Sequence, residues 1–174
     1  MNCYSVVGSW RVAMHAVRFS LSRRTLILGA VAALGAAASC RPILPTGAES
    51  GVSAAATDKI AAIRGRNQLA SLAADQKAEE AALQQARLMA ASGRMAHTAL
   101  PGHDFASRMK KNGIRLPAAE NLAQGQMELD ILFARWMDSD AHRRNMLDPR
   151  FGRFGLGYAE EKEGRRYWAM VLAV

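Results

Sequence analysis

The chain has 174 residues, of which about half are hydrophobic and 22% are charged, with a formal net charge of +8. The first 40 residues hold four of the 23 basic residues and none of the 15 acidic ones, so the remainder carries only +4. That charge is far below the positive excess typical of a nucleic-acid-binding domain. No glycine-rich loop with phosphate-binding spacing occurs either, so neither nucleic-acid nor nucleotide binding is expected.

Residues 1–39 have the three parts of an export signal in the required order. A basic region comes first, followed by an apolar run from Leu26 to Ala38 and then by small residues directly before Cys40. The apolar run has about 13 residues, whereas a helix needs roughly 20 to span a bilayer. The sequence therefore predicts an export signal rather than a permanent membrane-spanning anchor.

Two details of this signal indicate how the chain is exported. Arg23 and Arg24 stand before the apolar run and resemble the twin-arginine motif, although ordinary Sec signals also contain such pairs. The residues Ala-Ala-Ser-Cys resemble a lipobox, in which Cys40 becomes the lipidated first residue, but Ala37 replaces the preferred leucine. Plain cleavage after a small residue is the alternative. We expect an exported protein that is membrane-anchored through Cys40, or else periplasmic or extracellular.

Loss of the signal removes Cys3 and leaves Cys40 as the only cysteine, so no intramolecular disulfide is expected. Residues 40–57 are rich in Pro, Gly, Ser and Ala and have no apolar period, which predicts a linker. Residues 58–174 are long enough for one domain with a single core.

Helical patterns fill the first part of this domain. A first helix is expected to begin near Asp58, capped by Thr57 or Asp58, with Ile60, Ile63 and Leu72 on its apolar stripe. A second helix follows Asp75 and stops at Gly93.

A third, short helix is expected over 104–112, with Gly113 as its stop. The fourth helix has the clearest pattern, because Leu129, Leu132, Phe133 and Trp136 stand at i, i+3, i+4 and i+7. The period then changes: 154–159 and 167–174 are short apolar runs separated by a polar segment, which predicts a β-hairpin. Helices followed by strands indicate the α+β class.

Four segments in this order resemble a known family: MAHT at 95–98, AENLAQG at 119–125, WMDSDAHRRNML at 136–147, and the run from Phe151 to Gly157 followed by Tyr167 and Trp168. They are similar to the bacterial extracellular branch of the CAP superfamily (cysteine-rich secretory proteins, antigen 5, pathogenesis-related 1), also called SCP-like domains. The resemblance covers about residues 60–174. It implies an α–β–α sandwich, a small antiparallel sheet flanked by about four helices.

The resemblance also implies a cleft that contains two histidines and two acidic residues. By position, His97 and His142 match the histidines and Glu120 matches the first acid. The second acid falls on Ser139, which is a departure from the pattern, so the neighbouring Asp138 or Asp140 is a possible substitute. Asn121, Asp138 and Ser139 complete the predicted binding cleft.

Two imidazoles and a carboxylate in one cleft have three possible uses. His97, His142 and Glu120 could bind a divalent metal, with Zn²⁺ the usual preference for such ligands. They could also relay protons, or form the polar floor of a binding site. A carboxylate beside the histidines should raise their pKa values, and burial should oppose this. The structural alternatives are that both histidines are simply hydrogen-bonded, and that Asn121 satisfies backbone groups in a tight loop.

The resemblance implies three functions, because the fold does not assign the chemistry. The first is an envelope module that binds a small ligand, a lipid or a cell-wall component. The second is a metal-dependent peptidase or peptidoglycan hydrolase, and the third is a structural envelope lipoprotein. The missing second acid favours the first and third. Ser139 and His142 stand at i,i+3, a spacing that fits a helix cap and a cleft residue better than a catalytic dyad.

Overall fold

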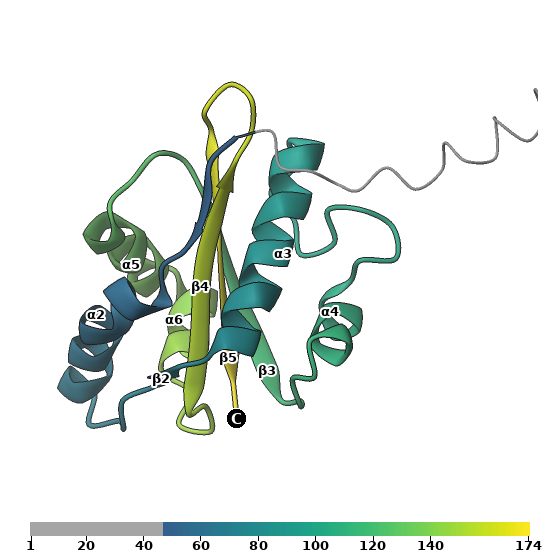
Figure 1. Ribbon diagram of the computed structural model, residues 1–174. Helices are drawn as coiled ribbons and strands as arrows, with labels where there is room; N and C mark the ends of the chain where they lie inside the picture. Colours follow the sequence, from purple (N-terminus) through teal and green to yellow (C-terminus); the bar gives the residue numbers. More distant parts are fainter. Residues whose placement is uncertain (1–46) are drawn as a thin grey trace, which may run out of the picture. The chain divides into compact units, whose positions relative to one another are not determined.

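A computed structural model describes residues 47–174 (Figure 1). The predicted export signal and the lipidation at Cys40 lie outside the described residues. The elements, in chain order, are β1 (Glu49–Gly51), α2 (Ser53–Arg66), β2 (Ala73–Ala74), α3 (Gln76–Ser92), α4 (Phe105–Lys111), β3 (Ala118–Gln124), α5 (Leu129–Asp138), α6 (Asp140–Met146), β4 (Arg153–Glu160) and β5 (Arg166–Ala173).

The strands form one five-stranded sheet in the order β1-β4-β5-β3, and the two-residue β2 adds to β4 in parallel. The other pairings are antiparallel. The predicted hairpin is confirmed, since β4 and β5 pair from Arg153 opposite Ala173 to Glu160 opposite Arg166. β3 had no strand signal of its own in the sequence, and it completes the sheet by pairing with β5.

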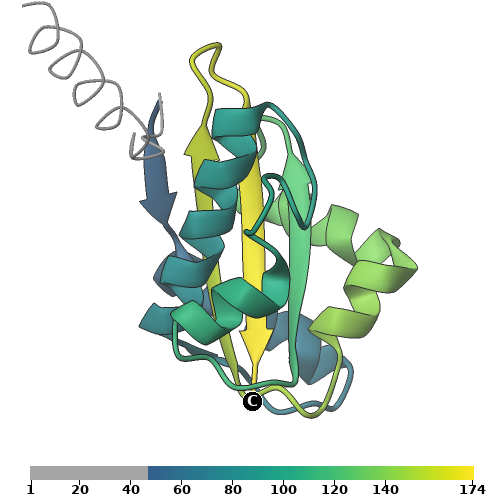
Figure 2. The ribbon, with the colours of Figure 1, turned by 90° about the vertical axis from the view of Figure 1, so that its right-hand side faces the viewer.

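Helices cover both faces of the sheet, as Figures 1 and 2 show. The strict alternation of buried side chains in β5 separates two cores: Tyr167, Ala169 and Val171 pack with α3 and α4, whereas Trp168, Met170 and Leu172 pack with α2, α5 and α6. The α–β–α sandwich and the α+β class are therefore confirmed. The described residues contain five helices rather than the four or so that were expected.

Glycine at position 155 allows α3 to lie directly on β4. A Cβ atom placed on Gly155 would stand 2.0 Å from the carbonyl carbon of Ala78 and 2.0 Å from the backbone nitrogen of Glu79. No side chain fits in that space, so the helix backbone and the strand backbone are in contact. This close packing gives the run from Phe151 to Gly157 a structural role in the fold.

The ends of α3 and α4 agree with the local sequence signals. The Asp75 carboxylate accepts the N–H of Ala78 at 2.8 Å and caps α3, which ends at Gly93 with φ of 64°. The Asp104 carboxylate accepts the N–H of Ser107 at 3.0 Å and caps α4. Gly113, just beyond α4, also has a positive φ. These caps are local, and they place both helices where the sequence predicted.

The predicted start of the first helix was wrong. α2 begins at Ser53, five residues before Asp58, and β1 precedes it, so the second half of the predicted 40–57 linker belongs to the fold. The reason is a tertiary cap: the Glu79 carboxylate of α3 accepts the N–H of Ser53 at 3.0 Å. α2 also ends at Arg66, so Leu72 lies beyond it, although it is buried as expected.

Trp136 is core, as predicted, and it also protects the edge of the sheet. Its side chain is 1% exposed, and its Nε1 donates to the Leu122 carbonyl of β3 at 3.0 Å. The Asn145 amide of α6 donates to the Glu120 carbonyl of the same strand at 3.5 Å. Carbonyls on the free edge of β3 thus have partners from α5 and α6, which reduces the tendency of an edge strand to pair with another chain.

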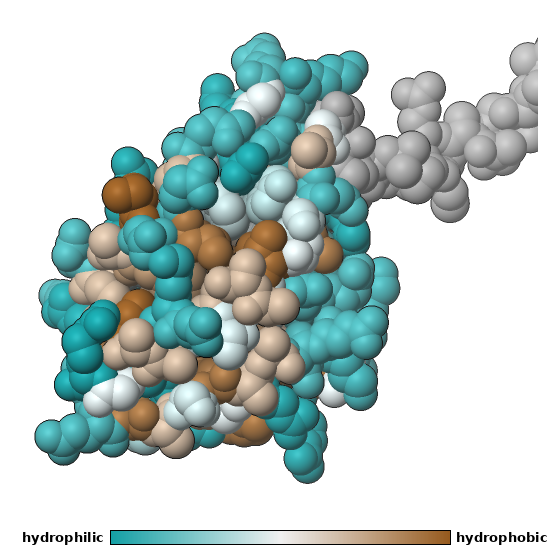
Figure 3. All heavy atoms as spheres, turned by 60° about the vertical axis from the view of Figure 1, so that its left-hand side comes forward, coloured by the Kyte–Doolittle hydropathy of each residue, from teal (hydrophilic) through white to brown (hydrophobic). Residues whose placement is uncertain are grey.

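A groove of about 440 Å³ runs between α2 and α5. Figure 3 shows this side of the molecule, where apolar side chains gather in the middle of a hydrophilic surround. The groove is lined by Asp58, Lys59, Ala62, Ile63, Arg66, Asp130, Phe133, Ala134 and Met137.

None of the helices in the described part of the chain combines the length and the apolar character needed to cross a membrane.

Candidate functional site

Strand β3 places the predicted site residues Glu120 and Asn121 on opposite faces of the sheet, because neighbouring side chains of a strand alternate. Glu120 lies on the face of α3 and α4, and Asn121 lies on the face of α6. Asn121 is therefore in a strand, and the expectation of a tight loop at this position was wrong. The side chains that reach Glu120 must come from the loop after α3 and from α4.

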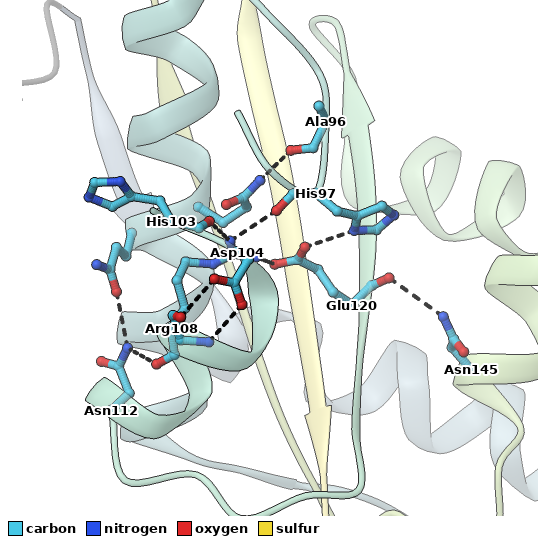
Figure 4. A network of polar contacts seen from close by, with 11 residues as sticks. Ala96, His97, His103, Asp104, Arg108, Asn112, Glu120 and Asn145 are labelled. Atoms are coloured by element: carbon cyan, nitrogen blue, oxygen red, sulfur yellow. Dashed lines mark hydrogen bonds and ion pairs between the residues drawn. The ribbon is translucent and has the colours of Figure 1, made fainter. Parts of the chain in front are cut away.

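Glu120 is the centre of a polar network (Figure 4). Its side chain is only 2% exposed, and both of its carboxylate oxygens are bound. Oε1 shares a hydrogen bond of 2.8 Å with Nδ1 of His97, and Oε2 accepts a 2.6 Å bond from Nη2 of Arg108. The sequence predicted that His97, Glu120 and His142 would converge on one cleft. The structure joins His97 to Glu120, although 23 residues separate them, and among the described residues no hydrogen bond or ion pair joins the His142 side chain to either of them.

Arg108 is the member of the network that was missed in the sequence. It is 1% exposed, and besides Glu120 it binds the carbonyls of His97 at 3.0 Å and His103 at 2.6 Å. It therefore joins α4, the 97–103 loop and β3. A signal was present, since Arg108 lies three residues after Phe105 and one before Met109, within the apolar face of a short helix. A charged residue in that position is normally paired.

His142 lies on α6 and is half-buried. Burial lowers its pKa, and the nearby charge of His97 lowers it further. Of the two opposing effects that were expected on the histidine pKa values, burial therefore dominates at His142. A lowered pKa keeps the imidazole of His142 neutral, with a free lone pair, to a lower pH than that of an ordinary histidine.

Two asparagines attach α6 to β3. The Asn121 amide donates to the His142 carbonyl at 3.1 Å, and the Asn145 amide donates to Oδ1 of Asn121 at 2.9 Å. Asn121 is fully buried, so its role is to hold the backbone of His142 rather than to contact a ligand. Asn145 was not predicted as part of the site. Together they fix the helix that carries His142 relative to the strand that carries Glu120.

Asp138 and Ser139 mark the junction between α5 and α6. Asp138 is exposed, and the Ser139 carbonyl accepts the N–H of Arg143 at 2.8 Å. Asp140 forms an ion pair with Arg143. Within residues 47–174, no hydrogen bond or ion pair joins these groups to Glu120, so the polar network around Glu120 does not contain the second acid of the family pattern.

A three-ligand metal site does not fit this arrangement. Among the described residues, no group of three or more His, Cys, Asp or Glu side chains is placed to hold a metal ion. The reason lies at Glu120, whose second oxygen is bound by the buried guanidinium of Arg108. That positive charge disfavours a cation at the same carboxylate. Glu120 instead orients His97 through Nδ1. The side chain of His97 is 60% exposed.

The groove between α2 and α5 offers different chemistry, because apolar side chains form most of its lining. Ligand sites are typically concave, mostly apolar and supplied with a few placed polar groups. Here the polar groups are four charged side chains, two basic and two acidic: Lys59, Arg66, Asp58 and Asp130. Lys59 of α2 forms an ion pair with Asp130 of α5, and Arg66 forms no ion pair with any described residue.

Comparisons with known proteins agree with the fold. The uncharacterized protein YkwD of Bacillus subtilis is 43% identical over 53 residues, which are 30% of this chain and only 21% of that protein. An outer surface protein of Borrelia burgdorferi has a similar structure, with a TM-score of 0.64 at 20% identity, covering 73% of this chain and 97% of that chain.

An extracellular protein of Bacillus anthracis that contains an SCP domain is similar as well, with a TM-score of 0.60 at 21% identity. The similarity covers 69% of this chain and 39% of that chain. A model of the family described as the Cysteine-rich secretory protein family matches residues 57–172, which is well over half of the sequence. The chain belongs to this family, the CAP family.

Proposed function

We propose that this CAP-domain protein is an exported binding module that holds a single-chain amphiphile in the groove between α2 and α5. One observation carries the proposal: a mainly apolar groove of about 440 Å³ in which Arg66 is the basic side chain without an ion-pair partner among the described residues. The two acidic side chains of the lining are Asp130, which pairs with Lys59, and Asp58. The volume of the groove lies within the range of small-molecule sites in proteins. Of the three functions left open by the sequence, this is the lipid-binding form of the first.

The two ends of such a ligand would meet different groups. Ala62, Phe133 and Met137 supply the apolar contact that an acyl chain needs, at about 0.8 kcal/mol for each buried methylene. Arg66 stands at the margin with no ion-pair partner among the described residues, so it can receive a carboxylate or another anionic headgroup. A neutral apolar ligand would make no use of that charge.

Displacement of a fluorescent fatty acid by hexadecanoate tests the proposal. Replacing Ala134 with phenylalanine fills the groove from an exposed position, so affinity should fall at least about tenfold without loss of fold. Ala91→Phe makes the same change at an exposed position of α3, on the other face of the sheet, and should bind like the parent. Equal affinities in all three proteins would exclude the groove as the binding site.

Export and anchoring through Cys40 are part of the proposal and are supported by the signal-like residues 1–39 and by relatives described as extracellular or outer surface proteins. A lipid on Cys40 would hold the domain at a membrane, because each buried methylene adds about 0.8 kcal/mol. Cys40→Ser should therefore move the protein from the membrane fraction to the soluble fraction. Unchanged membrane retention would reject the lipid anchor and leave the groove proposal intact.

A second candidate function, binding of a divalent metal by His97 and His142, is favoured by the bond between His97 and Glu120. A metal-binding histidine commonly forms a hydrogen bond to a carboxylate through its other ring nitrogen, as Nδ1 of His97 does with Glu120. The neutral imidazole of His142 would be the second ligand. These two histidines are too few for a closed zinc site, so water or a bound ligand would complete the coordination.

Zinc titration by calorimetry at several pH values tests this candidate. Affinity should be greatest near neutral pH and should fall in acid, because a protonated imidazole cannot coordinate. Because its pKa is lowered, His142 becomes protonated only below the usual value of about 6.5. His97→Ala and His142→Ala each remove one of the two ligands, so each should abolish binding at pH 7. His103→Ala is the matched control. Binding that survives both site variants, or that the control also loses, would reject the candidate.

A further inference from the structure

A second concave site lies at the end of the sheet where β4 begins and β5 ends, near the point marked C in Figure 1. It is a cavity of about 210 Å³ that is independent of both the groove and the histidines. Three cationic side chains border it: Lys77 from the first turn of α3, Arg115 from the loop after α4, and Arg153 from the start of β4. The cavity therefore gathers charges from three separate parts of the chain.

Asp75 and the C-terminal residue Val174 also line the cavity, so the three positive charges are only partly offset there. The one acidic side chain in the lining is Asp75, whose Oδ1 accepts the N–H of Ala78 and whose Oδ2 lies 3.8 Å from Arg153. Neither Lys77 nor Arg115 forms an ion pair with any residue in the described range 47–174. Three cations that share one cavity repel each other, and an anion placed among them would relieve that repulsion.

The position of Lys77 indicates that its ammonium group belongs to the cavity. A Cβ atom placed on Gly113 would lie 3.9 Å from Nζ of Lys77, so the ammonium is folded over the backbone after α4. Lys77 is also in the first turn of a 17-residue helix, where the helix dipole disfavours a positive charge. A bound anion would offset this unfavourable placement.

We propose that this cavity binds a phosphate group, either of a small soluble phosphate monoester or of a lipid headgroup. Two guanidinium groups can donate in parallel to phosphate oxygens, and the lysine adds a point charge. The volume admits a phosphate and a few attached atoms but is too small for a nucleotide-sized ligand. The proposal adds a site to the domain and does not depend on the groove or on metal binding.

Titration of the protein with inorganic phosphate and then with glycerol 3-phosphate, followed by amide chemical shifts in NMR spectra, tests the proposal. Chloride is exchanged for phosphate at constant ionic strength, so that general screening stays the same. Shifts should saturate and should be confined to residues around 75–77, 113–115 and 153. Arg115→Gln and Lys77→Gln should each weaken binding about tenfold, because each removes one charge-assisted contact.

The matched control is Lys110→Gln, which removes the same charge from an exposed position of α4 outside the cavity. It should bind phosphate like the parent. The three positions are exposed, so all variants should fold. Absence of saturable shifts, or an equal loss of affinity in the control, would overturn the proposal.

Vesicles of phosphatidylglycerol and of phosphatidylcholine distinguish the two sources of phosphate. Binding to the phosphatidylglycerol vesicles that Arg115→Gln weakens and glycerol 3-phosphate competes away would identify a lipid headgroup. Saturable binding of glycerol 3-phosphate without vesicle binding would identify a soluble monoester. Vesicle binding that neither Arg115→Gln nor Lys77→Gln alters would place the membrane contact elsewhere and, without phosphate shifts, would contradict the site.

Discussion

Replacing Gly155 with alanine is expected to destabilise the domain by at least about 3 kcal/mol, at or above the upper end of the usual cost of overpacking. A methyl group there would stand 2.0 Å from backbone atoms of Ala78 and Glu79. A flexible side chain can turn away from such a contact, but the backbone of α3 can only shift as a whole. A shift of α3 would also disturb Glu79, which caps α2.

Urea unfolding followed by circular dichroism measures this effect. Gly152→Ala is the matched control, because a Cβ on Gly152 meets nothing within 4 Å and the residue directly precedes the same strand, β4. We expect the control to unfold within about 0.5 kcal/mol of the parent, as surface substitutions usually do. Equal stabilities of the two variants would mean that α3 does not rest directly on β4.

Trp136→Ala is expected to cost about 3–5 kcal/mol. The side chain is 1% exposed and packs edge-to-face against Phe133, with ring centroids 5.7 Å apart. Its removal leaves a cavity in the core between α5 and the sheet. It also leaves the Leu122 carbonyl of β3 without the indole N–H that it accepts at 3.0 Å. Both effects act in the same direction.

The two contributions at Trp136 can be separated. Trp136→Phe keeps much of the apolar volume but removes the indole N–H, so its loss of stability should be intermediate between those of the parent and Trp136→Ala. Thermal unfolding measures all three proteins. A melting temperature of Trp136→Ala within a degree or two of the parent would mean that the residue does not support the core.

Elements whose ends are determined by local contacts were predictable from the sequence. Asp75 and Asp104 cap helices through N–H groups three residues on, and the short apolar run of β5 gave a strand signal. The start of α2 was not predictable, because its cap comes from Glu79, 26 residues later. β3 is Ala-rich and forms because β5 offers a partner, which no local propensity records.

The candidate site was predictable only in part. The family-like motifs brought His97 and Glu120 into one expected cleft, and the structure places them in contact. They did not indicate Arg108, whose importance comes from three bonds to groups of other segments, outside its own helix. The groove between α2 and α5 depends on the packing of two separately predicted helices, so no single sequence pattern contained it.

The most direct test of amphiphile binding in the groove is native mass spectrometry of the delipidated protein after incubation with hexadecanoate. The parent and Ala91→Phe are expected to carry one bound hexadecanoate each, and Ala134→Phe should carry none. Arg66→Gln should retain less than the parent, because the anionic end loses its partner. An absence of bound ligand in the parent, or the same occupancy in Ala134→Phe, would contradict the proposed function.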